Sequence, residues 1–598
     1  MYLFVNKAVF LLMIGGLCLI GSGVIMTYYD PYDLIFKWKL EFEEGGEIYE
    51  LWRDPPAEIF IKIYLFNITN AEEFMSGKEK LKVEEIGPYV YKELFIHDNV
   101  TFNENGTVST IPRHPLVWQP EMSAGRSEDD LLMLPNIALL SISQVVAPKS
   151  YFVRFPINMI IRQAKEQPIV KMTAREFMFG YETTLTTIGN NILPNWIKFD
   201  KVGLIDRMYD FSGDYETFFN GQTNPQLSGL YDTYRGSKDL EQWDGDHCSN
   251  IQYASDGVKF KSFVQPNETL KFFRKSMCRP QKLVRVGNDS LIDGLTASQY
   301  VFEENALDNG EINEHNKCFC RNGDCLPRGL IDVTDCYYGF PIALSYPHFM
   351  DADEKVADMT EGLHPDVNQH KSYFMINRES GLPLDVSVKL QINMAMKDVS
   401  NMAHVERFSN LVMPMLWFEI AMPGLPQNLQ NRFTFYLNLL PTMVEILLYG
   451  SYIVGVCLVI WAFVKASKQL KKNLERAQNM QHVVSTVNKG RVYPPCELTI
   501  INDNEMARIL EHDEDESYQI MNKRKLSQNS CKSSSGISSQ SMNSQQNNSN
   551  SSYIEEDDTL SELRIIEDEP VQLYAYLGRQ DSVLSTTESI SAILDNIK

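Results

Sequence analysis

Two long apolar stretches interrupt an otherwise mixed pattern of hydrophobic and polar positions. Ala8 to Met26 and Ile446 to Val464 each contain 19 residues without a charge. A helix of that length spans roughly 28 Å, close to the thickness of the hydrocarbon core of a bilayer. We therefore predict transmembrane helices over residues 8–28 and 441–464. The alternative for the first stretch is a cleaved signal peptide, but the run is long and Gly21–Ser22–Gly23 would be a poor cleavage site.

Basic residues directly after the second stretch indicate the orientation. Five of them follow within a short distance: Lys465, Lys468, Lys471, Lys472 and Arg476. Because basic residues stay on the cytosolic side, we expect the short N-terminus (1–7) and the C-terminal tail (465–598) to be cytosolic. The segment between the spans, 29–440, is then an ectodomain that faces the lumen or the exterior. It contains N-glycosylation sequons at Asn67, Asn99, Asn105, Asn267 and Asn288.

The ectodomain alternates apolar with polar or small residues in several places, as strands do. The clearest period of two comprises Val386, Val388, Leu390, Ile392, Met394 and Met396, and a second run begins with Ile59, Ile61 and Ile63. Gly87–Pro88 predicts a turn before Tyr89. Helical patterns cover roughly Phe155 to Lys165 and Thr173 to Tyr181. Strands with inserted helices predict an α+β fold.

Composition narrows the functional classes. The 598-residue chain has a net charge of −23, and phosphate recognition needs a basic surface, so we expect no nucleic-acid partner. The sequence contains no G-x-x-x-x-G-K-[ST], H-E-x-x-H or G-x-S-x-G pattern, so we expect no enzyme, no metal and no cofactor. The ectodomain carries 39 basic and 57 acidic residues, a net of −18. An anionic ligand would therefore need a local basic patch.

Six of the ten cysteines lie in the ectodomain: Cys248, Cys278, Cys318, Cys320, Cys325 and Cys336. An even number in an oxidising compartment favours disulfides, and C-x-C-x4-C lacks the paired C-x2-C of a zinc ribbon. Cys320 can close a small turn with Cys325, because the intervening Asn-Gly suits a tight reversal. Cys318 and Cys336 then need distant partners, and this reasoning leaves their pairing with Cys248 and Cys278 open. We interpret DGDHC (244–248) as a loop beside a disulfide rather than a metal site.

Several motifs occur in the order typical of one receptor family. They are YLFNITN (64–70), EIGPYVY (85–91), DTYRGSKDLEQWDGDHC (232–248), the cysteine cluster and YPHF (346–349). Together with the two-span layout, they make residues 1–470 resemble the class B scavenger receptor family. The resemblance implies an antiparallel β-barrel core with a helical bundle at its apex and an apolar tunnel directed towards the membrane. It also implies the disulfides Cys248–Cys318, Cys278–Cys336 and Cys320–Cys325.

The same resemblance suggests ligand-binding residues. Family members present basic residues at the tunnel entrance, and the corresponding stretch is INMIIRQAKEQ (157–167), followed by Lys171 and Arg175. Arg162 and Lys165 lie three apart, on one face of the expected helix. Their aliphatic stems could line an apolar mouth while their charged ends meet a carboxylate or phosphate. Arg162, Lys165 and Lys171 are therefore candidate ligand-binding residues; the alternative is a solvated helix face.

The C-terminal tail departs from most family members by its length. Ser527 to Ser552 is dominated by Ser, Asn and Gln, cannot form a core, and is expected to be disordered. Tyr518-Gln-Ile-Met and Tyr574-Ala-Tyr-Leu match the tyrosine-x-x-bulky-apolar pattern read by endocytic adaptors. Clathrin adaptors are thus candidate partners of the tail.

The resemblance leads to two functional alternatives. Family members bind lipoproteins, fatty acids or other lipids and pass lipid to the bilayer, so we expect a scavenger receptor and lipid transporter at the plasma membrane. A lysosomal branch of the family carries an enzyme to its compartment, which makes an endosomal or lysosomal trafficking receptor for a protein cargo the alternative. An ecto-enzyme is disfavoured by the missing motifs.

Overall fold

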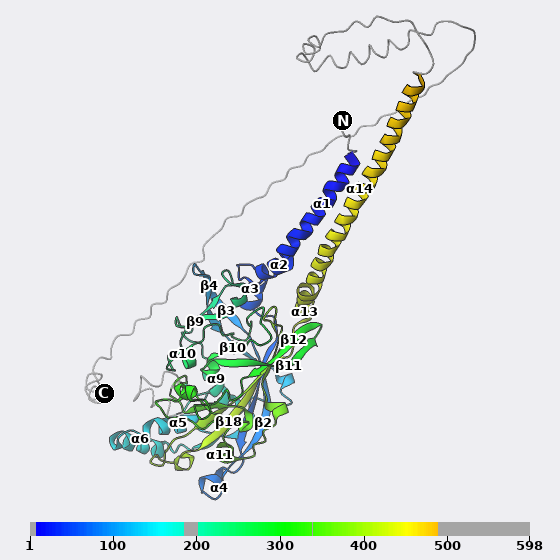
Figure 1. The fold of residues 1–598 in the computed structure, drawn as a ribbon. Helices are drawn as coiled ribbons and strands as arrows, with labels where there is room; N and C mark the ends of the chain where they lie inside the picture. The colour runs from blue at the N-terminus through cyan, green and yellow to red at the C-terminus, as the bar shows by residue number, and fades with distance from the viewer. Residues whose placement is uncertain (1–6, 184–200, 338, 488–598) are drawn as a thin grey trace, which may run out of the picture. The chain divides into compact units, whose positions relative to one another are not determined.

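The two apolar stretches form the long helices α1 (Lys7–Tyr28) and α14 (Leu440–Val487), which run side by side in Figure 1. The structure, a computed structural model, describes residues 7–183, 201–337 and 339–487. Both helices are long and apolar enough to cross a membrane. α13 (Gln427–Thr434) leads into α14 through a π-helical turn, Phe435–Leu439. α14 continues past the predicted end of the span because the residues after Val464 are mostly good helix formers such as Lys, Leu, Ala and Gln.

Glycines bring α1 and α14 into close contact. A Cβ atom on Gly16 would lie 2.8 Å from the carbonyl oxygen of Gly455, and a Cβ atom on Gly23 would lie 2.6 Å from Ser451 Oγ. The backbones can approach this closely only because these positions lack side chains. Van der Waals packing of this kind is a main force between helices in lipid.

Gly16→Leu is expected to destabilise the helix pair by about 1–3 kcal/mol, because the added side chain meets backbone atoms that cannot turn away. The measurement is the thermal unfolding temperature of the full chain in nanodiscs. Gly15→Leu is the matched control, since a Cβ atom on Gly15 would have nothing within 4 Å. An equal loss in both variants would mean that the pair is not held by this contact.

One large sheet forms most of the ectodomain core. Its strands follow the order β10-β11-β12-β16-β17-β18-β1-β2-β15. Three further strands lie off this order: β14 pairs with β17, β13 pairs with β14, and β5 pairs with β2. All pairs are antiparallel except β2 with β15, and within the described residues no ladder joins β10 to β2 or β15. The predicted closed barrel therefore stays a prediction. The strands are β1 (Ile59–Ile68), β2 (Leu81–Glu93), β5 (Leu116–Trp118), β10 (Leu270–Phe272), β11 (Gln281–Ile292), β12 (Leu295–Phe302), β13 (Ile331–Asp332), β14 (Ile342–Ser345), β15 (Thr360–Glu361), β16 (Tyr373–Ile376), β17 (Pro383–Ala395) and β18 (Val412–Met422).

The two period-two patterns are confirmed as the strands β17 and β1. Leu390 and Ile392 of β17 and Ile61 and Ile63 of β1 are buried in the core. Both strands pair with β18, and Ile63 lies opposite Phe418. Alternating apolar residues thus identified the two strands on either side of β18.

The turn predicted at Gly87–Pro88 is wrong. The pair lies inside β2, where the peptide bond is cis and the register with β1 shifts between Ile63 and Leu65. A strand can continue through proline at such an irregularity, because the missing N–H falls where pairing is already interrupted. A Cβ atom on Gly87 would lie 2.7 Å from the Tyr64 ring, so the close approach of β1 requires glycine.

Smaller sheets and short helices complete the described residues, and they adjust three predictions. The first predicted helix begins at Tyr151 rather than Phe155, and the second spans Ala174–Phe179. The DGDHC stretch, predicted as a loop, contains one helical turn, α10.

The remaining strands are β3 (Ile96–Asn103), β4 (Thr107–Arg113), β8 (Glu216–Phe219) and β9 (Tyr231–Tyr234) in one sheet, and β6 (Leu131–Pro135) and β7 (Ile169–Thr173) in another. The remaining α-helices are α2 (Pro31–Leu40), α3 (Glu47–Arg53), α4 (Ala71–Met75), α5 (Ile137–Val146), α6 (Tyr151–Ala164), α7 (Ala174–Phe179), α9 (Leu204–Met208), α10 (Asp246–Ser249), α11 (Glu354–Ala357) and α12 (Val367–His370).

Helices α5 and α6 lie at the end of the large sheet that is remote from α13. Strand β18 ends at Met422 and leads into α13. Its first residue, Val412, therefore lies at the end of the sheet remote from α13, and an 11-residue strand places it about 35 Å from Met422. The connection from β17 to β18 is at this remote end. It holds α5 through a 2.9 Å bond from Lys397 N to Gln144 Oε1. It holds α6 through Asn158, which donates to Asn401 O (3.1 Å) and accepts from Ala403 N (2.8 Å).

A buried ion pair crosses the core. Arg274 Nη2 lies 2.6 Å from Glu93 Oε1, and the Glu93 side chain is fully buried. His114 Nδ1 donates to the same carboxylate at 3.0 Å, and the Tyr209 hydroxyl donates to it at 3.2 Å. Burial raises the pKa of Glu93, but the Arg274 charge and the His114 hydrogen bond outweigh it and lower the pKa to about 2. Glu93 therefore stays ionised at every physiological pH.

Glu216 in β8 is in the opposite situation. Its carboxyl is buried and forms no ion pair within the part of the chain that the structure describes, so burial raises its pKa to about 8. The Tyr231 hydroxyl donates to Oε1 at 2.7 Å. The carboxyl is therefore largely protonated in the folded chain at neutral pH.

Glu216→Gln is expected to change the pH dependence of stability. A carboxyl with a folded pKa above its unfolded value of about 4.5 binds a proton on folding, so its contribution is lost as pH rises from 4.5 through 8. Glutamine keeps an acceptor for Tyr231 and does not ionise. The melting temperature of the variant, relative to the parent, should thus rise between pH 5.5 and 7.5, by an amount equivalent to roughly 1 kcal/mol per pH unit. A difference that stays constant with pH would contradict the assignment.

Candidate functional site

Helix α6 has an exposed apolar face at the remote end of the sheet. Tyr151, Phe152, Phe155 and Met159 are 61, 85, 51 and 52% exposed, and we call these four residues the α6 face. Phe152, Phe155 and Met159 follow the i, i+3, i+7 spacing of one helix face. The Tyr151 ring lies 5.6 Å from the Phe155 ring. A contiguous group of exposed apolar side chains is typical of an interaction surface.

The opposite side of α6 packs on the ectodomain core. Ile161 is fully buried, and Val153, Ile157 and Ile160 lie against the main hydrophobic cluster. Together with the Asn158 hydrogen bonds, this packing fixes the helix on the connection between β17 and β18. The α6 face is therefore presented on a supported element rather than on a free loop.

Basic residues gather in the segment that contains the α6 face. Residues 147–171 include five basic residues and one acidic residue, Glu166, a net of +4 in an ectodomain of strongly negative charge. None of the five forms an ion pair with any other described residue. The segment thus carries the local excess of positive charge that an anionic ligand needs. The five are Lys149, Arg154, Arg162, Lys165 and Lys171.

The three candidate ligand-binding residues lie on different parts of this segment. Arg162 is exposed in the last turn of α6. Lys165 is exposed but lies beyond the helix, in a left-handed conformation with φ of 53°, so the expectation that it shares a helix face with Arg162 is wrong. A left-handed residue at this position ends a helix. Lys171 is exposed on β7, while nearby Arg175 is paired with Glu128 at 2.6 Å.

Sequence reasoning missed the aromatic residues of the α6 face. The predicted helix began at Phe155, which left Tyr151 and Phe152 outside it. Pro156 lies inside α6, where proline is unusual because it removes a helical hydrogen bond. The missed signal is Ser150, a residue type that favours the N-cap and that precedes the true start.

Two small cavities lie along one face of β17. Side chains two apart on a strand point to the same face, so Val386, Val388 and Ile392 share a side of the sheet with buried Leu390. One cavity, of about 40 Å³, is lined by Val386, Val388, Ile420, Met422, Phe272, Phe374 and Arg274, among others. The other, of about 10 Å³, is lined by Ile392, Leu344, Ile137 and Met208, among others. The described residues thus contain small apolar spaces along this face, and the expected tunnel stays a prediction.

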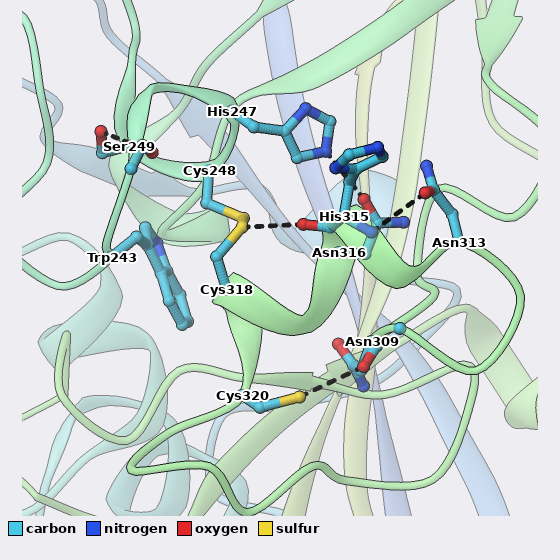
Figure 2. The surroundings of a disulfide bond; sticks show 12 residues. Trp243, His247, Cys248, Ser249, Asn309, Asn313, His315, Asn316, Cys318 and Cys320 are labelled. Atoms are coloured by element: carbon cyan, nitrogen blue, oxygen red, sulfur yellow. Dashed lines mark hydrogen bonds between the residues drawn. A yellow bond between two sulfur atoms is a disulfide. The ribbon is translucent and has the colours of Figure 1, made fainter.

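The six ectodomain cysteines form three disulfides. The structure joins Cys248 to Cys318, Cys278 to Cys336 and Cys320 to Cys325, with Cα atoms 6.1, 6.1 and 4.4 Å apart. These are the pairs that the family resemblance implies. Figure 2 shows the first of them beside Trp243, whose Nε1 donates to the carbonyl oxygen of Cys278 at 2.7 Å. Among the described residues, no cluster of His, Cys, Asp or Glu could hold a metal ion.

The remaining predicted sites are placed as follows. Asn99, Asn105, Asn267 and Asn288 are exposed, as glycosylation requires. Asn67 is half-buried in β1. Its Oδ1 accepts a hydrogen bond from Met133 N at 2.9 Å, and its side-chain nitrogen, the atom that glycosylation modifies, takes no part in that bond. Modification of all five stays a prediction. Tyr518 and Tyr574 lie outside the described residues.

Two membrane-spanning helices around a disulfide-linked α+β ectodomain define a two-span membrane protein, and comparison with known proteins identifies the family. The CD36 family model matches residues 13–466. Scavenger receptor class B member 1 from Cricetulus griseus is 31% identical over 452 residues, which cover 75% of this chain and 86% of that protein. Lysosome membrane protein 2 from Homo sapiens is 28% identical over 404 residues, which cover 66% and 81%. The chain belongs to the CD36 family of class B scavenger receptors.

Proposed function

We propose that this chain is a cell-surface receptor that captures lipoprotein particles, fatty acids or other lipids and passes lipid to its membrane. The observation that carries the proposal is the α6 face with its basic surroundings. A lipid particle or a fatty acid offers apolar surface beside anionic groups, and this helix offers the complement to both. The relatives named scavenger receptor class B member 1 support a receptor role.

We further propose that lipid moves along the cavity-bearing face of β17 within a closed barrel. The two cavities on this face, of about 40 and 10 Å³, are too small for an acyl chain, so side chains must move apart during passage. Burial of an acyl chain contributes about 0.8 kcal/mol per methylene, which drives uptake without a covalent step. In this scheme 8–28 and 441–464 span the bilayer, 29–440 is exposed, and 1–7 and 465–598 are cytosolic.

Selective lipid uptake tests this function. Cells that express the full chain would receive particles with one label on the lipid and another on the particle protein. Lipid label should enter cells above the empty-vector level and in excess over protein label. Normal surface amounts without a gain in lipid label would reject the proposal.

Charge reversal at Arg162 and Lys165 is expected to weaken binding of anionic particles by about tenfold, more than neutralisation by glutamine does. Deleting an exposed charge removes only a weak attraction, about 1 kcal/mol at 4 Å in water, whereas Arg162→Glu with Lys165→Glu introduces repulsion. The difference should shrink with added salt, since exposed charges are screened beyond about 8 Å at physiological ionic strength. The measurement is particle binding per surface molecule. If the glutamate and glutamine double variants bind equally at low salt, the end of α6 around Arg162 and Lys165 is a solvated surface.

The second candidate is an endosomal or lysosomal trafficking receptor for a protein cargo. The relatives named lysosome membrane protein 2 favour it. Microscopy of the tagged chain distinguishes the two, because a trafficking receptor resides mainly in internal membranes. Truncation after Arg476 removes Tyr518 and Tyr574, and a rise in surface amount would assign sorting to the tail.

A further inference from the structure

Helix α2 has one apolar face that anchors it to the ectodomain. Tyr32, Phe36 and Leu40 follow each other at four-residue spacing, which places them on one side of the helix. Phe36 and Leu40 are 5% and 1% exposed. They belong to a separate hydrophobic cluster at the base of the ectodomain, with Leu295 of β12 and Leu429 and Phe433 of α13. This face packs the helix against β12 and against α13, which leads into α14.

A second apolar face lies on the other side of α2 and is exposed in the part of the chain that the structure describes. Leu34, Ile35 and Trp38 are 55, 39 and 57% exposed. At about 100° per residue, Leu34 and Trp38 lie roughly 160° around the helix from Phe36, and Ile35 lies about 100° from it. Polar contacts flank this face: Lys37 pairs with Asp33 at 2.6 Å and Lys39 with Glu47 at 3.6 Å. A helix that borders water normally has polar residues where Leu34 and Trp38 lie.

The second face follows closely after α1, one of the two helices apolar enough to cross a membrane. Only Tyr29 and Asp30 separate the end of α1 at Tyr28 from the start of α2, and the Asp30 carboxylate caps α2 by accepting from Tyr32 N at 2.9 Å. Tyr28 and Tyr29 are 80% and 58% exposed. Tyrosine and tryptophan are enriched where a span leaves the hydrocarbon region. The exposed face therefore begins at the level of the lipid headgroups.

We propose that Leu34, Ile35 and Trp38 insert into the non-cytosolic leaflet, so that α2 lies in the membrane interface. Interfacial helices bury their apolar face about 5–10 Å into the boundary between headgroups and acyl chains. Lys37 and Lys39 can extend from the flanks towards lipid phosphates. Because the other face of α2 belongs to the ectodomain base, the insertion holds that base against the bilayer. A lipid leaving the ectodomain would then meet the leaflet directly, a consequence that rests on the proposed function, whereas the insertion itself does not.

Spin labels in the full chain test the insertion. Cys18, Cys457, Cys496 and Cys531 are replaced by serine, the chain is placed in nanodiscs at one copy per disc, and a nitroxide is attached at Leu34→Cys or Trp38→Cys. Glu44→Cys, an exposed position after the helix, is the matched control. Labels at 34 and 38 should collide more with lipid-soluble oxygen than with a water-soluble nickel chelate, with the reverse at 44. Equal access of the chelate at all three positions overturns the proposal, and so does protection from both reagents, which means a protein cover.

Tryptophan quenching provides a readout without substituted cysteines. Lipids brominated near the top of the acyl chain quench only indole rings at that depth. The parent chain should lose a fraction of its fluorescence in such nanodiscs, and Trp38→Phe, which keeps an aromatic ring, should lose clearly less. Equal fractional quenching of parent and variant overturns the insertion. Lipid uptake by the same variants is scored separately, so loss of insertion and loss of transport are distinguishable.

Discussion

Phe152→Asp together with Phe155→Asp is expected to weaken the binding of lipid particles about 100-fold or more. Burying a phenylalanine side chain contributes about 1.5–3 kcal/mol, and these two side chains are 85% and 51% exposed before binding. Their combined contribution of about 3 kcal/mol corresponds to roughly two orders of magnitude in the dissociation constant. The added carboxylates also oppose the basic surroundings of the α6 face.

The measurement is saturation binding of labelled, phospholipid-coated particles to cells, normalised to surface receptor. Phe152→Leu with Phe155→Leu is the control, because it keeps apolar side chains and should bind within a few-fold of the parent. Unlike the effect of charge reversal at Arg162, this loss should persist at high salt, since apolar burial is not screened. Parent-like binding by the aspartate variant at normal surface amounts would exclude the α6 face as the capture site.

The aromatic residues of the α6 face illustrate what sequence reasoning can and cannot reach. Basic residues were expected near the entrance from family resemblance, and the structure shows Arg162, Lys165 and Lys171 exposed, while their role in ligand binding stays a prediction. Exposure of Phe152 could not be foreseen, because a helical period alone does not say which apolar positions are covered by protein. Lys165 was placed on the helix because residue spacing does not reveal a left-handed residue at its end.

The strands were easier to predict than the places where their pairing changes. Val388, Leu390 and Ile392 are two positions apart, and side chains two apart on a strand point to the same face. Their pattern can therefore be read from the local sequence alone. The continuation of β2 through Gly87–Pro88 depends on a register shift against β1, which no local pattern encodes. The pairs Cys248–Cys318 and Cys278–Cys336 likewise join segments 70 and 58 residues apart. The family resemblance supplied them where local reasoning stopped.

The buried ion pair links stability to the cavity that we propose as part of the lipid path. Arg274 pairs with Glu93 and also lines the 40 Å³ cavity beside Phe272 and Phe374. A charge pair beside an apolar space stays fixed only if both partners are present, because a lone buried charge is strongly unfavourable. No local pattern predicts this pair, because its members are 181 residues apart.

Arg274→Met is therefore expected to destabilise the folded chain by about 3–5 kcal/mol at pH 7.4, because Glu93 is left as an uncompensated buried charge. Domains are stable by only about 5–15 kcal/mol, so most of the variant should be retained in the endoplasmic reticulum with endoglycosidase-sensitive glycans. Methionine keeps much of the side-chain volume, so a cavity is not the main cause of the loss. Parent-like surface amounts and melting temperature would contradict this account of the pair.

A second substitution separates charge from packing. Glu93→Gln in the Arg274→Met background removes the lone charge while keeping an oxygen that accepts from His114 and Tyr209, so most of the lost stability and surface amount should return. In Arg274→Met alone, burial without the arginine raises the pKa of Glu93, and stability should recover as pH falls from 7.4 to 5 and the carboxyl is protonated. The parent, whose Glu93 has a pKa of about 2, should lack this particular recovery, and the Arg274→Met/Glu93→Gln variant should match the parent's pH dependence. If acid does not narrow the gap between Arg274→Met and the parent, the loss comes from packing rather than from the unpaired carboxylate.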